Sequence, residues 1–333
     1  MKIRIKRAGL MATIQDQGRH HYLSQGVPVS GAMDSLSAQI ANLCLGNDVN
    51  DAVIEFTQSG ASFVTEEDML ICLSGAGACL KTEIRRLPQH RPLFIPAGTG
   101  LYLENAPPGN RSYLAVAGGW HVPEALGSRS TYITARFGGL DGRFLKEKDV
   151  LKSTEKFTPT TMAIWNALKG NAINYPKWGV ARALFLSRDF KSIRVMRGRE
   201  FNWFDDASTG NFFAEEYILG HNSNRMGYQL QGKPMHRAIQ GELLSTAVTP
   251  GTIQVTNNGD LILLMADCQT TGGYPRIAQV AAVDLPLCAQ LQPGDAINFK
   301  EISWKEAEKL YIEHQLELRK LAVTVQQRYS GSF

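Results

Sequence analysis

Apolar residues recur along the chain mostly with a period of two, or in short runs that end at turn residues. Segments of this kind are Lys2–Arg7, Met69–Leu73, Leu93–Ile95, Tyr113–Val116, Ser192–Met196, Thr252–Val255 and Leu261–Met265. Alternation places successive side chains on opposite faces of an extended strand, and a short apolar run is typical of a strand buried on both faces. The pattern therefore predicts a mainly β protein.

One pair of these segments predicts a hairpin. Asn258 and Gly259 lie between Thr252–Val255 and Leu261–Met265. Both residue types tolerate a positive φ angle, which the favoured two-residue hairpin turns require. We expect the two strands to pair through this turn.

Two segments have helical spacing instead. From Asp34 to Leu45, apolar residues recur on one side, and Gly46 supplies a C-terminal stop. A second helix is predicted to begin at Ser303, since Glu306 follows three residues later as in a capping box. Its apolar stripe either packs on the body of the protein or forms a coiled-coil seam, and consists of Trp304, Ala307, Tyr311, His314, Leu318, Leu321 and Val325.

The stretch from Lys152 to Lys177 is rich in threonine, asparagine and lysine and has no sustained period. It is interpreted as a connection between two β-rich bodies. The expected organisation is an N-terminal β domain at 1–185, with the connection at about 152–185, a second β domain at 186–302, and a helix with its tail at 303–333.

Composition limits the class of protein. The chain is 44% hydrophobic and 20% charged, and 35 basic residues against 31 acidic ones give a net charge of only +4, spread evenly. This argues against nucleic acid as a partner. The longest apolar run, Leu261 to Ala266, is too short to cross a bilayer, and the N-terminus lacks the apolar core of a signal peptide. Five cysteines without metal-ligand spacing indicate buried free thiols, so a cytoplasmic location is expected.

The search for cofactor motifs is negative. The nearest approach to a phosphate loop is Gly75–Thr82, where Leu80 occupies the place of the second glycine. The sequence also has no His-Glu-x-x-His zinc motif, no Cys-x-x-Cys pair, no Gly-x-Ser-x-Gly elbow and no biotinyl-lysine motif. We therefore expect no metal or cofactor on this chain alone, with any ATP bound by a partner.

Polar and glycine-rich blocks remain as candidate sites. Ser30–Asp34 precedes the first helix, which either Ser30 or Asp34 caps. Gly127–Thr131 and Arg136–Gly139 combine backbone amides with arginines, which suits a carboxylate or phosphate ligand. Asp267–Tyr274 follows an apolar strand, and such loops commonly contact ligands.

Blocks along nearly the whole chain resemble the biotin-dependent carboxyltransferase-like family. This family is also called allophanate hydrolase subunit 2 or KipI-antagonist (KipA) proteins, and it includes the C subunits of bacterial 5-oxoprolinase. The blocks are Thr13–Arg19, Gly26–Asp34, Ala41-Asn42, Gly46-Asn47, Ala52–Glu55, Leu73–Ala76, Arg111–Gly119, Leu126–Thr131, Asn224–Tyr228, Ser245, Pro250–Gln254, Asp267–Pro275, Asp284 and Gln290–Asp295.

The resemblance implies two tandem cyclophilin-like β-barrel domains and a protein that works with partners. The implied partners are the KipI-like B subunit of the complex and the A subunit of 5-oxoprolinase, and self-association stays open. The implied reaction is the ATP-driven opening of the 5-oxoproline lactam to glutamate. Two alternatives stay open. One is a non-catalytic regulatory protein that binds a KipI-like partner, and the other is a carboxyltransferase that acts on urea or a related amide with biotin carried by another chain.

Candidate residues follow from these blocks. Arg129 and Arg225 are candidates for clamping a carboxylate, and Asp34 and Asp267 for orienting donors or acting as general bases. Structural ion pairs and helix caps are the competing interpretations. The residues expected to bind a lactam or urea substrate are Ser30, Ser128, Gln254, Gln269, Thr271, Gly272, Gly273 and Tyr274.

Overall fold

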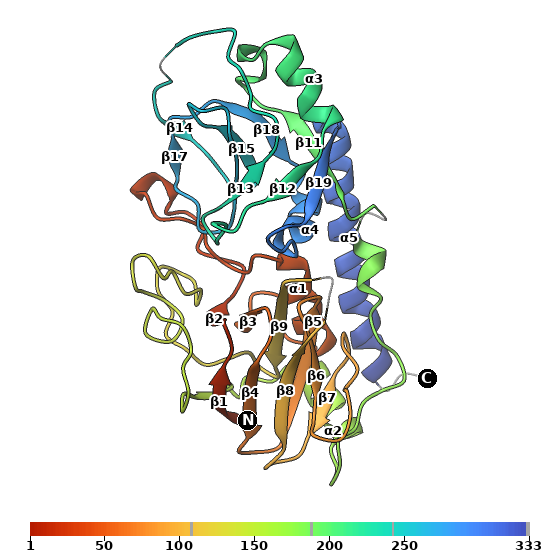
Figure 1. Ribbon diagram of the computed structural model, residues 1–333. Coiled ribbons are helices and arrows are strands. Elements are labelled where there is room, and N and C mark those ends of the chain that lie inside the picture. The colour runs from red at the N-terminus through yellow and green to blue at the C-terminus, as the bar shows by residue number, and fades with distance from the viewer. Residues whose placement is uncertain (107–108, 187–188, 242, 331–333) are drawn as a thin grey trace. The chain divides into compact units, whose positions relative to one another are not determined.

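The computed structural model describes residues 1–106, 109–186, 189–241 and 243–330, and the chain forms two compact units (Figure 1). The first unit consists of Met1–Gly18, Asp34–Phe185 and Gln315–Phe333, and the second of Arg19–Met33 and Leu186–His314. The units thus interleave along the chain. The domain boundaries expected at residues 185 and 302 stay predictions.

The first unit contains two five-stranded antiparallel sheets. One has the order β10-β1-β4-β8-β6, with the strands Val150–Lys152, Lys2–Ala8, Ala61–Thr65, Gly100–Asn105 and Ala78–Lys81. The other has the order β2-β3-β9-β5-β7, with Met11–Gln15, Val53–Thr57, Arg111–Val116, Met69–Gly75 and Leu93–Ile95. Alternation explains β1, in which Ile3 and Ile5 are buried while Arg4 and Lys6 are not.

Helix α1 (Ser35–Cys44) packs against β5 and β9 of the second sheet. Leu36, Ile40 and Leu43 are buried, and Gly46, with a φ of 71°, follows the helix. The prediction of this helix is confirmed. Helix α2 (Pro159–Leu168) lies within the stretch interpreted as a connection, so that interpretation missed it.

The second unit contains a closed barrel of seven strands in the order β11-β18-β15-β16-β13-β12-β19 (Figure 1). The strands are Ser192–Arg197, Arg276–Val280, Thr252–Val255, Leu261–Leu264, Gly227–Gln231, Tyr217–Leu219 and Ala296–Glu301. All neighbours are antiparallel except β11 and β19, whose parallel pairing closes the barrel. The expected mainly β fold with few helices is confirmed.

Shorter elements complete the second unit. Helix α3 (Asp206–Ala214) packs on the barrel through Phe212, whose ring stacks on Phe299 with the centroids 4.7 Å apart. Helix α4 (Leu285–Ala289) precedes β19, and a two-stranded ribbon joins β14 (Thr246–Ala247) to β17 (Thr271–Gly272).

The expected hairpin between β15 and β16 is present, with a different turn. The Gly259 amide donates to the Thr256 carbonyl at 3.0 Å, and Gly259 has a φ of 87°. Asn258 is not in the left-handed region, so only the glycine supplies the positive φ. The loop that joins the two strands therefore has five residues, 256–260, instead of a two-residue turn.

The C-terminal helix α5 (Trp304–Tyr329) begins where predicted, and the Glu306 amide donates to Ser303 Oγ at 3.2 Å. Leu318 and Val325 are buried, whereas Trp304 and Tyr311 are exposed. Part of the stripe thus packs on the chain itself, while pairing with a second chain stays untested. Residues 331–333 of the expected tail lie outside the described residues.

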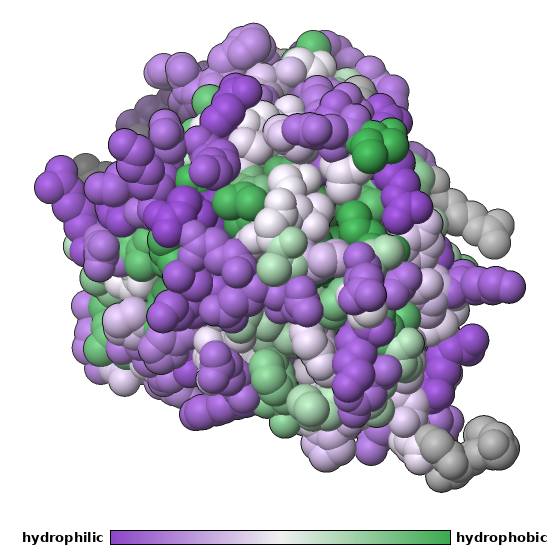
Figure 2. Space-filling view, turned by 90° about the horizontal axis from the view of Figure 1, so that it is seen from below, coloured by the Kyte–Doolittle hydropathy of each residue, from purple (hydrophilic) through white to green (hydrophobic). Residues whose placement is uncertain are grey.

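The face in Figure 2 is largely hydrophilic, with hydrophobic side chains in smaller patches between the polar ones. In the described parts of the chain, the helices are too short or too polar to cross a membrane. All five cysteines are free thiols; Cys79 is half-buried and the other four are buried.

Candidate functional site

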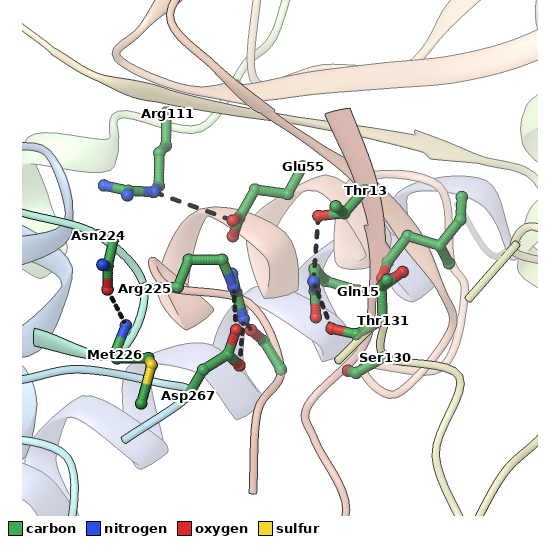
Figure 3. A network of polar contacts seen from close by, with 12 residues as sticks. Thr13, Gln15, Glu55, Arg111, Ser130, Thr131, Asn224, Arg225, Met226 and Asp267 are labelled. Carbon is green, nitrogen blue, oxygen red and sulfur yellow. Dashed lines mark hydrogen bonds and ion pairs between the residues drawn. The ribbon is translucent and has the colours of Figure 1, made fainter. Parts of the chain in front are cut away.

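Arg225 and Asp267 form a buried ion pair at one end of the barrel (Figure 3). Arg225 lies just before β13 and Asp267 follows β16, and these strands are antiparallel neighbours, so the start of one meets the end of the other. Arg225 Nε and Nη2 donate to the two carboxylate oxygens at 2.7 and 3.0 Å. The Asp267 amide also donates to the Arg225 carbonyl at 2.8 Å, so backbone and side chains hold the pair.

The same guanidinium extends to the segment that carries Ser30. Arg225 Nη2 donates to the Gly31 carbonyl at 2.6 Å, and the Ser30 amide donates to the Ala266 carbonyl at 3.1 Å. Ser30 has a φ of 58°, in the left-handed region that non-glycine residues rarely adopt. Its hydroxyl is buried and has no hydrogen-bond partner among the described residues. Strain and an unsatisfied polar group together are typical of a functional position.

Gln254 organises a second group of the predicted residues. Its side chain is fully buried on β15; Nε2 donates to the Tyr274 carbonyl at 3.2 Å, and Oε1 accepts from Gln269 Nε2 at 3.3 Å. Gly272 leaves room for this amide, because a Cβ at this position would lie 2.5 Å from Gln254 Nε2 and the side chain would have to shift. Of the remaining predicted residues, Thr271 lies in β17 beside Gly272, and Gly273 lines a cavity with Tyr274.

Asp34 lies in the first unit, where it caps α1. Its carboxylate accepts from the Ser37 amide at 2.9 Å, from Ser37 Oγ at 2.7 Å and from Arg182 Nη2 at 2.6 Å. The carboxylate is fully buried. Asp34, not Ser30, is therefore the cap, and the structural interpretation of this aspartate is confirmed, while its catalytic role stays a prediction.

A buried polar network extends from Asp34 to residues that the sequence analysis did not select. The Tyr113 hydroxyl accepts from the Asp34 amide at 2.7 Å and donates to Glu55 Oε2 at 2.8 Å. Glu55 Oε1 lies 3.9 Å from Arg111 Nε (Figure 3). Burial, and then the charges of Glu55 and Asp34, raise the pKa of Tyr113, so the phenol stays protonated. The available signal was Glu55 itself, a charged residue between Ile54 and Phe56 in the strand Val53–Thr57.

His90 lies at the edge of this network. Its Nδ1 is 3.0 Å from Ser74 Oγ. Burial lowers the pKa of His90 to about 4, with a further contribution from the positive charge of Arg182. The imidazole is therefore neutral at pH 7.

The loop around Arg129 is bound to an internal carboxylate. Asp16 accepts from Gly18 N at 2.8 Å, Ser128 Oγ at 2.7 Å and Arg129 N at 2.6 Å, and also from Ser130 Oγ. Of the loop amides, Arg129 N binds Asp16, while Ser130 N donates to Ser128 Oγ and Thr131 N to the Ile14 carbonyl. The expectation that this loop binds an external anion stays a prediction.

The side chains of this loop also have internal partners. The Arg129 guanidinium lies 3.3 Å from Glu124, and both side chains are partly exposed. Next to the loop, Gln15 Nε2 donates to Thr13 Oγ1 at 3.0 Å and to the Thr131 carbonyl at 3.3 Å (Figure 3). The predicted roles of Ser128 and Arg129 toward substrate stay predictions.

Across the described ranges, His, Cys, Asp and Glu side chains form no group of three or more that could hold a metal ion. The structure thus brings together Arg225, Asp267 and Ser30 in one place and Gln254, Gln269 and Tyr274 in another. These two groups belong to the second unit, whereas Asp34, Ser128 and Arg129 belong to the first.

The chain belongs to the carboxyltransferase domain family, because the family model for carboxyltransferase domain subdomains A and B matches residues 25–301. Among individual relatives, it is 38% identical to the C subunit of 5-oxoprolinase from Escherichia coli, over 96% of this chain and 97% of that protein. It is 34% identical to the C subunit of 5-oxoprolinase from Haemophilus influenzae, over 95% and 96% of the two chains.

Larger proteins contain a similar region. The chain is 30% identical to urea amidolyase of Saccharomyces cerevisiae, over 96% of this chain but only 18% of that protein. The crystal structure of the Kluyveromyces lactis urea amidolyase superposes with a TM-score of 0.85 at 27% identity, covering 96% of this chain and 20% of that one.

Proposed function

We propose that this chain is the C subunit of an ATP-dependent 5-oxoprolinase. In this proposal it acts with the A subunit of the enzyme and the KipI-like B subunit to open the 5-oxoproline lactam to glutamate. The observation that carries the proposal is the match to bacterial 5-oxoprolinase C subunits, which covers more than nine-tenths of both chains in each of two cases. The sequence lacks a phosphate loop, so the ATP chemistry is assigned to the partner subunits.

The geometry supports a role for the Arg225 end of the barrel in binding. Opening a lactam passes through a tetrahedral centre whose oxygen gains negative charge, and preoriented donors stabilise that charge. We assign this role to Ser30 Oγ, because this buried hydroxyl has no partner among the described protein groups. Arg225 fixes the Ser30–Gly31 segment through the Gly31 carbonyl, and Asp267 fixes Arg225. In this scheme Arg225 and Asp267 position the segment, and Ser30 contacts the substrate.

Two other functions follow from specific observations. The 30% identity to a yeast urea amidolyase supports a carboxyltransferase that takes its carboxyl group from biotin on another chain. The resemblance to KipI-antagonist proteins supports a regulatory protein that binds a KipI-like partner without catalysis. The carboxyltransferase would depend on biotin, whereas the oxoprolinase would not. The regulatory protein would not be needed for turnover, whereas the oxoprolinase subunit would be.

The test is reconstitution. The chain is co-purified with the A and B subunits from the same source, and glutamate release from 5-oxoproline is measured with and without ATP and with added avidin. We expect ATP-dependent glutamate release that needs all three proteins and is insensitive to avidin. Equal activity without this chain would overturn the enzyme proposal, and inhibition by avidin would favour the carboxyltransferase.

Ser30→Ala then tests the site within the complex. Because the hydroxyl has no described protein partner, its removal leaves the stability nearly unchanged, while loss of a substrate hydrogen bond lowers kcat/KM by about tenfold. Ser153→Ala is the matched control, since Ser153 Oγ is also buried without a described partner but lies in the first unit. Equal turnover in both variants would exclude Ser30 from the site.

A further inference from the structure

A cavity of about 600 Å³ lies beside helix α2 in the first unit. Its walls come from the N-terminal residue, the turn at 67–68 between β4 and β5, Ala97 between β7 and β8, and residues between 155 and 165. All of these segments lie within the described ranges, and no undescribed residue adjoins them in the sequence. The volume falls within the range of small-molecule sites, about 300–1,000 Å³. None of its lining residues has a role in the proposed function.

Part of the wall is apolar and aromatic. Phe157, Met162 and Trp165 line the cavity from α2 and the residue before its cap. The Trp165 ring meets the ring of Phe94 edge-on, with the centroids 5.3 Å apart, and this contact restrains the indole. Met162 is 42% exposed, so a ligand can reach this wall from solvent. The N-terminus and α2 lie at the lower end of Figure 1, and Figure 2 shows the molecule from that end, with hydrophobic patches between hydrophilic side chains.

Hydrogen bonds hold the walls in place. Thr158 caps α2, and its Oγ1 accepts from the Thr161 amide at 3.0 Å. Asp68 Oδ1 accepts from the Ala97 amide at 2.8 Å, which joins two of the lining turns. A ligand would therefore meet a largely preformed site, which lowers the entropic cost of binding.

The charge of the cavity comes from the carboxylates of Glu67, Asp68 and Glu155. Glu67 lies 3.0 Å from the Met1 amino group, which offsets its charge. In the described parts of the chain, Asp68 and Glu155 form no ion pair with a basic group. Lys156 follows Glu155 in the sequence but does not line the cavity, and the lining side chains include no lysine, arginine or histidine. The cavity thus combines an apolar wall with negative charge.

A metal ion is not the cation that this arrangement favours. Among the described residues, His, Cys, Asp and Glu side chains form no group of three or more that could hold one. Hard metal ions bind through several oxygen ligands, and an apolar wall offers them none. An organic cation can use both features, because its apolar body is removed from water while its charge is paired.

We propose that this cavity binds a small organic amine that carries an apolar body. The body packs on Phe157, Met162 and Trp165, and the ammonium group pairs with Asp68 and Glu155. An ammonium group has several N–H donors for carboxylate oxygens, and an indole attracts a cation to its face. The cavity and its charge do not depend on the reaction proposed above.

Ligand-observed NMR titration of the full chain tests this proposal with two probes that share a phenyl body. Phenethylamine is positively charged at neutral pH, whereas phenethyl alcohol is uncharged. We expect the amine to bind at least about fivefold more tightly, because two exposed ion pairs and a cation–π contact each contribute modestly. The preference should fall as the salt concentration rises, since salt screens the charges.

Carboxylate variants test the origin of the preference. Asp68→Asn combined with Glu155→Gln should make the two probes bind equally, and the asparagine keeps an acceptor for the Ala97 amide. The matched control is Asp141→Asn combined with Glu147→Gln. Both of these side chains are exposed and do not line the cavity, so this control should keep the preference.

A second pair of variants tests the location of the site. Met162→Arg places bulk and positive charge in the wall and should abolish binding of the amine. Ala167→Arg is the control, because Ala167 is exposed on the same helix but does not line the cavity. Four results would overturn the proposal: no binding of phenethylamine by the wild-type chain, equal binding of the two probes, an unchanged preference in the double carboxylate variant, or unchanged binding in Met162→Arg.

Discussion

Replacing Asp34 by alanine removes three acceptor contacts from the start of α1. The contact with the Ser37 amide is an N-cap, whose loss costs about 1 kcal/mol. The contact with Arg182 is an ion pair in which the arginine side chain is only 13% exposed and the aspartate is fully buried. Removing one partner of a buried ion pair costs about 3 kcal/mol when the charge that is left unpaired is partly exposed to solvent. We therefore expect Asp34→Ala to lower the free energy of unfolding by about 4 kcal/mol.

Urea denaturation followed by circular dichroism measures this loss. With a slope of about 3 kcal/mol per M, the midpoint should fall by more than about 1 M. Asp34→Asn keeps the acceptor for the Ser37 amide and should lose only about 3 kcal/mol. Glu124→Ala is the control, because Glu124 forms a partly exposed pair with Arg129 at 3.3 Å and should cost less than about 1 kcal/mol.

A double-mutant cycle with Arg182→Met isolates the ion pair. If the pair is as described, the double variant should be more stable than the sum of the single losses predicts, by at least about 2 kcal/mol. A loss below about 1 kcal/mol in Asp34→Ala, or additive losses in the cycle, would refute the reasoning. If a complex that contains the Asp34→Asn variant is folded but has no turnover, this result would instead support the catalytic role predicted from the sequence.

Three further predictions concern pH, backbone conformation and charge. The pKa of His90 is about 4 in the folded chain, whereas its ordinary value is 6.5. As the pH falls, the unfolded chain therefore takes up a proton at this position before the folded chain does. The free energy of unfolding should fall by about 3 kcal/mol between pH 6.5 and 4. Urea denaturation at several pH values should show that His90→Gln lacks this pH-dependent loss of the free energy of unfolding and that His121→Gln keeps it. Gly75→Ala should cost at least about 2 kcal/mol in thermal denaturation, because Gly75 has a φ of 103° and a Cβ would meet the backbone of β9; a change within about 0.5 kcal/mol, the noise of a surface substitution, would contradict this. Arg225→Ala should destabilise the chain more than the double replacement Arg225→Met/Asp267→Leu, since only the single variant strands a buried charge; the reverse order in urea denaturation would contradict the ion-pair description.

Sequence patterns predicted those elements whose buried faces are long and regular. Strand β1 follows from its alternation, and α1 from Leu36, Ile40 and Leu43 with Gly46 as the stop. Helix α2 was missed because its buried side consists of only Thr161, Ile164 and Leu168, although Thr158 before a proline was an available N-cap signal. Helix α3 contains residues with low helix propensity, and packing of Phe212 on the barrel stabilises it.

The candidate site was predictable residue by residue, but its groupings were not. Arg225 and Asp267 meet because β13 pairs with β16, and Glu55 meets Tyr113 because β3 pairs with β9 in register. These pairings join segments far apart in the sequence, and short-range patterns carry no information about them.

The interleaving of the two units has a consequence for how the protein is made. The first unit includes Leu318 and Val325 of α5, so it cannot be completed until nearly the whole chain has been synthesised. The second unit must keep residues 19–33 available until the barrel strands that follow residue 186 emerge. A cut at any peptide bond between residues 18 and 315 would therefore separate the pieces of at least one unit. Exchanging a unit between relatives would require all of its separate pieces to be moved together.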